Sequence, residues 1–98
     1  MTYEFKAKVE QWQGPSTWYL VSVPKKYYKE LKEISVSLKG GFGSIKVEAR
    51  FGETTVSTSI FPNNEDQNFI LFVKKAVRTK ENLDVGSMVD VQITLKDI

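Results

Sequence analysis

The sequence predicts a mainly β protein of about six strands with two short helices. Several segments alternate apolar and polar residues with the two-residue period of a half-buried strand. Two other segments, at residues 19–31 and 69–82, each pass from an apolar run into a lysine-rich stretch with the spacing of a short helix. Their similarity, about half a chain apart, is compatible with two related halves, although the matching residues are few.

The first half of the chain predicts two strands and a helix. Residues 3–12 alternate apolar with charged side chains, which indicates a strand with one solvated face. After a Gly-Pro-Ser turn at 14–16, residues 17–23 are nearly continuous in apolar character, as in a strand covered on both faces. Pro24 suits the first turn of a helix, which we expect over residues 24–33.

The middle of the chain predicts a hairpin. Residues 35–38 are either a short strand or the end of the helix, and 39–43 form a glycine-rich connection. Residues 45–51 alternate clearly, and a Gly-Glu turn leads into a Thr- and Ser-rich strand at 54–61. The hydroxyl groups of this second strand are expected to line one of its faces.

The last third predicts a strand, a helix and a closing strand. Residues 69–73 form an apolar run, 74–82 have helical spacing, and 88–95 alternate again after a glycine turn. With 98 residues and 41% hydrophobic content, the chain is expected to form one domain over residues 1–98.

Composition excludes several kinds of chemistry. The chain has no Cys and no His, so it cannot form disulfides, build zinc sites from their usual nitrogen and sulfur ligands, or use Cys–His or Ser–His catalysis. We therefore expect a non-enzymatic protein without a metal or another cofactor. An enzyme that uses a lysine or a carboxylate remains an alternative.

The net charge of +2 is too small to produce the strong positive field of many nucleic-acid-binding proteins. The N-terminal residues lack the pattern of a signal peptide, and no apolar run reaches the length of a membrane helix. A cytoplasmic location, no membrane association and a monomeric state are the resulting expectations.

A series of landmarks in fixed order resembles a known family. The landmarks are Trp12, Trp18-Tyr19, Pro24, residues 58–62, residues 71–78 and residues 83–91. In this order they resemble the bacterial and archaeal domain-of-unknown-function family 1905, and the resemblance covers nearly the whole chain. It implies a small, closed or partly open Greek-key β-barrel with short helices, and it implies no established activity.

The chain departs from the family pattern at two positions. The Asp-Gly expected before the fifth strand is replaced within residues 65–68, and Ser87 stands where an acidic residue usually follows the turn glycine. Turn geometry that depends on those residues is open at this point.

The preferred functional hypothesis is a binding or regulatory module for a small anionic or polar ligand, or for a protein partner. Its candidate ligand-binding residues are Arg78, Trp18, Thr58 and Lys74. A guanidinium can hold a carboxylate or phosphate with two hydrogen bonds, but a structural ion pair or a helix carbonyl contact that holds the end of the barrel together is the favoured role of Arg78. Trp18, with Trp12 and Tyr19, could line the mouth of the barrel, but buried aromatic side chains are the usual filling of a small barrel, so a place in the core is the favoured interpretation.

The less favoured alternative is nucleic-acid binding through two basic segments. Eight of the fourteen basic residues lie in them, and the candidate contacts are Lys25, Lys26, Lys29 and Lys75. This hypothesis needs the two predicted helices to lie side by side. Lysines on the solvated face of an amphipathic helix are the simpler explanation.

Overall fold

The computed structural model of this chain describes residues 1–12, 16–38 and 43–96. The predicted turn at 14–16 and the predicted connection at 39–43 therefore lie largely outside the described residues. Among the residues that are described, no helix has the length and hydrophobicity needed to cross a membrane.

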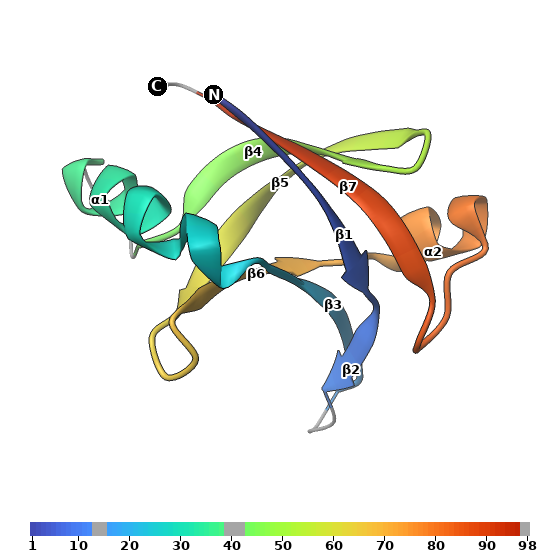
Figure 1. Cartoon of the computed structure of the whole chain (residues 1–98). Coiled ribbons are helices and arrows are strands. Elements are labelled where there is room, and N and C mark those ends of the chain that lie inside the picture. The colour runs from blue at the N-terminus through green and yellow to red at the C-terminus, as the bar shows by residue number, and fades with distance from the viewer. Residues whose placement is uncertain (13–15, 39–42, 97–98) are drawn as a thin grey trace.

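The described part of the chain is mainly β, as predicted, and its strands form one antiparallel sheet that curls into a half-barrel (Figure 1). The strands are β1 (Thr2–Lys8), β2 (Glu10–Trp12), β3 (Trp18–Val23), β4 (Ile45–Phe51), β5 (Thr54–Asn63), β6 (Asn68–Phe72) and β7 (Met88–Leu95). Their spatial order is β1-β7-β4-β5-β6-β3-β2. The count is seven instead of about six because the predicted first strand is divided in two.

The division falls at Val9, between β1 and β2. The Val9 N–H donates to the carbonyl of Ser87 at 2.8 Å, and the Val9 carbonyl accepts from the N–H of Gly86 at 2.8 Å. On one side of this bend β1 pairs with β7, and on the other side β2 pairs with β3. The two ends of the sheet are therefore consecutive in the chain, and the bend between them makes the sheet curl.

The topology contains the Greek key that the family resemblance implied. Strands β4, β5 and β6 are consecutive neighbours, and β3 lies on the far side of β6 after a connection that carries the first helix. Such a four-strand arrangement, with one long connection, defines the motif.

Both predicted helices are present. The first begins as a 3-10 turn, η1 (Lys25–Tyr27), after Pro24 and continues as α1 (Tyr28–Ser37). It ends later than predicted, so the alternative of a strand at 35–38 is wrong. The hydroxyls of Ser35 and Ser37 donate to the carbonyls three residues earlier, which keeps both side chains paired within the helix. The second helix, α2, is Lys75–Glu81.

The two helices lie at opposite ends of the molecule (Figure 1). Each one follows a strand of the same neighbouring pair, because α1 follows β3 and α2 follows β6. That pair is antiparallel, with Val23 opposite Phe69 and Leu20 opposite Phe72, so the C-terminal ends of its strands point in opposite directions. The helices that continue from those ends must therefore diverge.

The core lies on the concave side of the sheet, and its residues follow the predicted alternation. In β4 the buried side chains are Ile45, Val47, Ala49 and Phe51, with exposed side chains between them. Trp12 and Trp18 do not fill this core, because both side chains are exposed.

The two departures from the family pattern have distinct outcomes. Gln67 takes a positive φ of 53°, a conformation that glycine adopts at lower cost. In the turn before β7, Gly86 has a φ of 91° and the Ser87 hydroxyl accepts the backbone N–H of Asp84 at 3.0 Å. A carboxylate could accept the same bond, so Ser87 supports this turn in its place.

Candidate functional site

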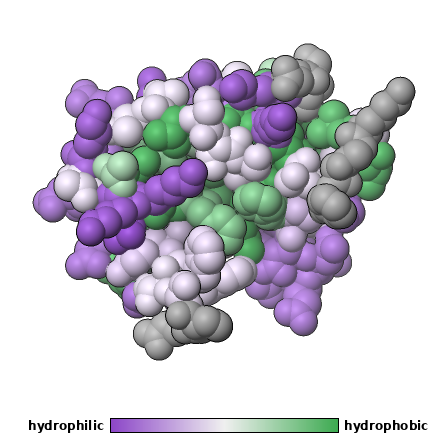
Figure 2. Space-filling model, turned by 180° about the vertical axis from the view of Figure 1, so that it is seen from behind, coloured by the Kyte–Doolittle hydropathy of each residue, from purple (hydrophilic) through white to green (hydrophobic). Residues whose placement is uncertain are grey.

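A cleft of about 730 Å³ lies where the convex face of the sheet meets α2. It is lined by Thr17, Trp18, Tyr19, Lys46, Ser57, Thr58, Ser59, Phe61, Phe72, Val73, Lys74, Lys75, Arg78 and Lys96. Figure 2 shows the reverse side of the molecule relative to Figure 1, with hydrophobic residues in the middle of the face and hydrophilic residues around them. The lining of the cleft likewise contains both hydrophobic and hydrophilic side chains.

Aromatic side chains form the apolar part of the cleft. Phe61 and Phe72 each follow a core residue, Ile60 and Leu71, and a strand turns successive side chains to opposite faces. The two phenylalanine rings therefore lie on the convex face, with their centroids 5.7 Å apart. The Trp18 ring packs against Phe72 at 5.3 Å.

The charged side chains that line the cleft are all basic. They are Lys46, Lys74, Lys75, Arg78 and Lys96, and no Asp or Glu of the described residues lines it. Within residues 1–12, 16–38 and 43–96, the single ion pair is Lys6–Asp90, at 3.9 Å and exposed to solvent. The five cations thus have no carboxylate partner in the described part of the chain, and they favour an anion in the cleft.

Arg78 is the most firmly held of these cations. Its Nε donates to the carbonyl of Val73 at 3.2 Å, and its Cζ lies 3.7 Å from the centroid of the Tyr19 ring. The side chain is half-buried, and its two terminal nitrogens have no hydrogen bond within the described residues. A guanidinium fixed in this way keeps two donor groups available for a ligand.

Hydroxyl groups from β5 also line the cleft. Ser57 and Ser59 lie on the convex face, opposite Glu48 and Lys46 of β4. The Lys96 ammonium donates to the Ser57 hydroxyl at 3.4 Å. Thr58, opposite the buried Val47, is half-buried and also lines the cleft, and its hydroxyl has no hydrogen-bond partner within the described residues. These groups can donate to or accept from a polar ligand.

The structure brings together all four residues that the sequence analysis proposed for ligand binding. Arg78, Trp18, Thr58 and Lys74 come from α2, β3, β5 and the β6–α2 junction, and all line the cleft. Lys75, proposed for nucleic-acid binding, lines it as well. The arginine is held by a carbonyl and an aromatic ring, and no internal carboxylate contacts it among the described residues.

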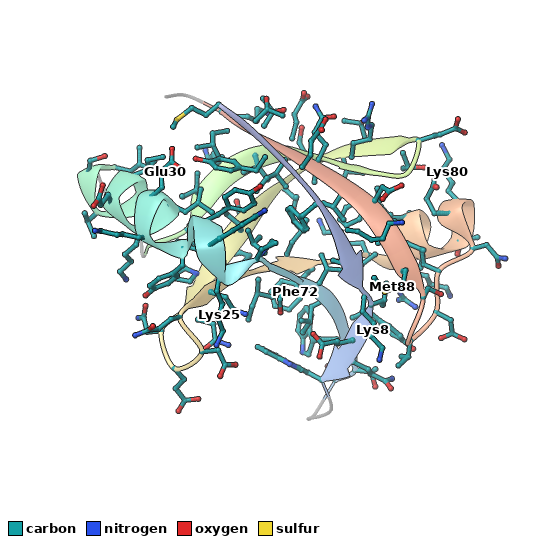
Figure 3. The ribbon with its side chains drawn as sticks, viewed as in Figure 1. Lys8, Lys25, Glu30, Phe72, Lys80 and Met88 are labelled. Atoms are coloured by element: carbon teal, nitrogen blue, oxygen red, sulfur yellow. The ribbon has the colours of Figure 1, made fainter. Side chains whose placement is uncertain are left out.

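The other three nucleic-acid candidates lie elsewhere. Lys25 and Lys26 are on η1 and Lys29 is on α1, away from the cleft and from α2. Figure 3 shows Lys25 and Lys80, one from each basic segment, on opposite sides of the molecule. The nucleic-acid alternative required the two basic helices to lie side by side, and they do not, because β3 and β6 direct their helices to opposite ends of the molecule.

Several residues that line the cleft were not predicted from the sequence. Lys46 and Lys96 stand at ordinary solvated positions of strand patterns, and only the sheet pairing brings them beside β5. Phe61 and Phe72 left a clearer signal. Each adds a second apolar residue after a core residue, so both faces of β5 and β6 are apolar at that point.

Metal binding receives no support from the described residues, which contain no cluster of three or more His, Cys, Asp or Glu side chains suited to a metal ion. The described side chains of the cleft offer nitrogen cations, hydroxyls and aromatic rings. Among its cations a lysine is the one type that could act as a base, after it loses a proton.

Comparison with known proteins identifies a family and no activity. The family model described as "Domain of unknown function (DUF1905)" matches residues 5–93 of the 98 residues. No curated protein matches the chain. Since the match runs from the middle of β1 through most of β7, the chain belongs to the DUF1905 family.

Proposed function

We propose that this protein is a non-enzymatic binding module whose cleft holds a small anionic ligand with an aromatic or apolar part. The observation that carries this proposal is the lining of the cleft, where the described residues supply five cations, no carboxylate and an aromatic wall. The volume of about 730 Å³ falls in the range of small-molecule sites.

The arrangement gives each half of such a ligand a partner. The aromatic rings of Trp18, Phe61 and Phe72 can cover a planar or apolar group and remove it from water. The guanidinium of Arg78 and the neighbouring ammonium of Lys74 can bind a phosphate or carboxylate. Because Arg78 is already held by Val73 and Tyr19, binding would cost little additional side-chain ordering.

An enzymatic role has less support. Acid–base catalysis needs a group that can take and return a proton within reach of the substrate. No His, Cys, Asp or Glu of the described residues lines the cleft, so the lysine side chains would have to act as the base, and each would first have to lose its proton. Binding by Lys25, Lys26, Lys29 and Lys75 as one nucleic-acid surface also has little support, since three of them lie away from α2.

The proposal is tested by thermal unfolding in the presence of matched compounds. The panel contains inorganic phosphate, a nucleoside, the corresponding mononucleotide, and an aromatic carboxylate. We expect the aromatic anions to raise Tm more than either phosphate or the neutral nucleoside does, because only they use both parts of the cleft. The absence of any shift with all four compounds would contradict the proposal.

A pair of charge reversals locates the effect. Lys74→Glu places a carboxylate in the cleft, whereas Lys80→Glu makes the same change on α2 outside it. We expect the shift in Tm caused by the aromatic anions to be lost in the first variant and kept in the second. An equal loss in both variants would show a nonspecific charge effect instead of a site.

A further inference from the structure

The aromatic surface of the cleft continues beyond its border. Phe72 is its centre, and the Trp12 ring, which does not line the cleft, packs against Phe72 at 6.4 Å. With Trp18 and Phe61, the four rings come from the adjacent strands β2, β3, β6 and β5. Trp12 and Phe61 pack against Phe72 at 6.4 and 5.7 Å, so the centroids at the two ends of the row lie at most 12.1 Å apart, which is longer than one planar ring system.

These rings are accessible and are not arranged as one flat surface. Trp12, Trp18 and Phe61 are 45%, 52% and 41% exposed. Their planes meet the plane of Phe72 at 85°, 52° and 55°, so the surface is ridged. A ligand with several separate planar groups, which can tilt independently, fits such a ridged surface better than a ligand with a single large planar ring system does.

Cations border this row of rings. Lys46 and Lys96 lie next to β5, beyond Phe61 in the order of the strands, and Lys74 and Lys75 lie just after Phe72 in the chain. A matching ligand therefore carries several planar rings, and its negative charges lie beside the Phe61 and Phe72 part of the row. Single-stranded nucleic acid has both, and aromatic side chains beside a cationic groove are its general mode of recognition.

Other polyanions match less well. An acidic polysaccharide has charges but no planar aromatic rings, and an acidic peptide has few rings for each charge. A duplex carries the phosphates but keeps the faces of its bases stacked inside, where exposed aromatic side chains cannot reach them.

We infer that the cleft and the row formed by Trp12, Trp18, Phe72 and Phe61 bind a short single strand of nucleic acid, of about four nucleotides at a spacing of about 3.4 Å. This inference rests on the proposed function, because the first nucleotide occupies the anion-binding cleft. The following bases stack along the row toward Trp12.

The experiment measures the affinity of the whole chain for oligothymidylates of one, two, four and eight nucleotides by NMR or fluorescence titration. We expect the affinity to rise with length up to about four nucleotides and then to level off. It should fall with salt, with a logarithmic slope of about −2 if three phosphates are neutralised. Abasic oligomers of the same length and charge should bind at least about 5-fold more weakly.

Trp12 separates the row from the cleft. Trp12→Ala should weaken binding of the tetranucleotide by about 5-fold or more and leave binding of the mononucleotide unchanged. Trp12→Phe should restore much of the loss. Trp12→Leu keeps apolar cover over Phe72 without a ring, and so tests stacking if the alanine variant folds poorly. Val36→Ala, at an exposed apolar position on α1, is the control.

The outcomes distinguish this inference from the proposed function. If the mononucleotide binds and the tetranucleotide binds no more tightly, the row plays no part and the inference is wrong, although the cleft remains an anion site. If neither they nor any of the small aromatic anions bind, both are wrong. If an abasic oligomer, an acidic peptide or a duplex binds as tightly as the tetranucleotide does, the inference that bases stack on the row is also wrong.

Discussion

Arg78 illustrates how one side chain can be both structural and available to a ligand. Its Nε contact to Val73 ties the start of α2 to the end of β6, and its stacking on Tyr19 joins α2 to β3. The sequence indicated a useful guanidinium at this position. It offered a carbonyl contact as one possibility but could not indicate the Tyr19 ring, which is nearly sixty residues away and lies beside Arg78 only after the strands have paired.

Arg78→Lys should keep the charge and lose both contacts, since an ammonium cannot reproduce the planar stacking or the Nε bond. We expect the free energy of unfolding to fall by about 1 kcal/mol, from the loss of one hydrogen bond and one cation–π contact. Urea denaturation measures this change. Lys80→Ala on the same helix should change it by less than about 0.5 kcal/mol, and equal effects in both variants would contradict the structural role of Arg78.

Gln67 lies in the segment where the chain departs from the Asp-Gly of the family pattern, and its backbone is strained there. Its φ of 53° lies in the left-handed region, where a side chain with a Cβ is strained. Gln67→Gly should therefore raise the free energy of unfolding by about 0.5–1 kcal/mol. Asn82→Gly provides the comparison, because Asn82 has nearly the same φ of 54° but tolerates it better. Lower thermal stability of Gln67→Gly than of the natural chain would contradict this account.

Tyr3 gives the protein a specific sensitivity to high pH. Its hydroxyl is buried without a hydrogen bond of ordinary geometry within the described residues. Burial, and then the nearby Glu30 carboxylate, raise the pKa of Tyr3 from 10.0 to about 12. As pH rises past 10, the phenol of the unfolded chain ionises first, so the stability tied to this group is complete below pH 10 and is lost toward pH 12.

Tyr3→Phe should remove this part of the pH dependence. The variant should unfold with a similar or slightly larger free energy at pH 7, because it lacks the unpaired buried hydroxyl. Its stability relative to the natural chain should then increase between pH 10 and pH 12. Urea denaturation of both proteins at about pH 7, 10 and 11 measures the difference between their free energies of unfolding. Because both proteins have the same lysines, the effect of lysine titration cancels in this difference. A loss of more than about 1 kcal/mol at pH 7 would show that the hydroxyl has a partner.

At the scale of elements, α2 is fastened at its C-terminal end to the β4–β5 hairpin. The Thr54 hydroxyl donates to the Glu81 carboxylate at 2.5 Å. Gly52, in the turn, has a φ of 60°, and a Cβ there would fall against the same carboxylate. The predicted Gly-Glu turn is therefore also the docking point of a helix, which no local pattern could reveal.

Gly52→Ala should reduce the free energy of unfolding by about 1–2 kcal/mol through backbone strain and the displacement of Glu81. Gly86→Ala is a matched control, because Gly86 also has a positive φ but a Cβ added there would meet no described atom within 4 Å beyond its chain neighbours. It should show the strain alone and a smaller loss. The two losses, compared by thermal denaturation, should become more alike when Glu81→Ala is added to each variant. Equal losses before that addition would contradict the contact with Glu81.

The elements themselves were accessible to sequence reasoning because each depends on a local period. Strand alternation over residues 45–51 and 88–95 matches β4 and β7 residue for residue. The bend at Val9 was not accessible, because its hydrogen bonds go to Gly86 and Ser87 at the other end of the chain. The positions of the helices followed from the pairing of β3 with β6, which is also a nonlocal property.

At the scale of the whole molecule, the cleft is assembled from segments that are far apart in the chain. The strands β7, β4, β5 and β6 are neighbours in one sheet, and this arrangement brings to one cleft the side chains of Lys46, Ser57, Phe72 and Lys96. Sequence patterns identified residue types suited to an anion but could not show that five cations line one cleft. They also favoured a buried role for Trp18, since apolar character does not tell which face of a curled sheet a ring occupies.

The most direct test of the central claim uses the two tryptophan indole N–H signals in NMR spectra recorded during titration with a mononucleotide. Trp18 lines the cleft and Trp12 does not. We predict that the Trp18 signal and the Arg78 side-chain signal shift with a common dissociation constant, while the Trp12 signal and the amides of Lys25 and Lys29 change little. Unchanged Trp18 and Arg78 signals, or equal shifts in the amides of those two lysines, would contradict the account.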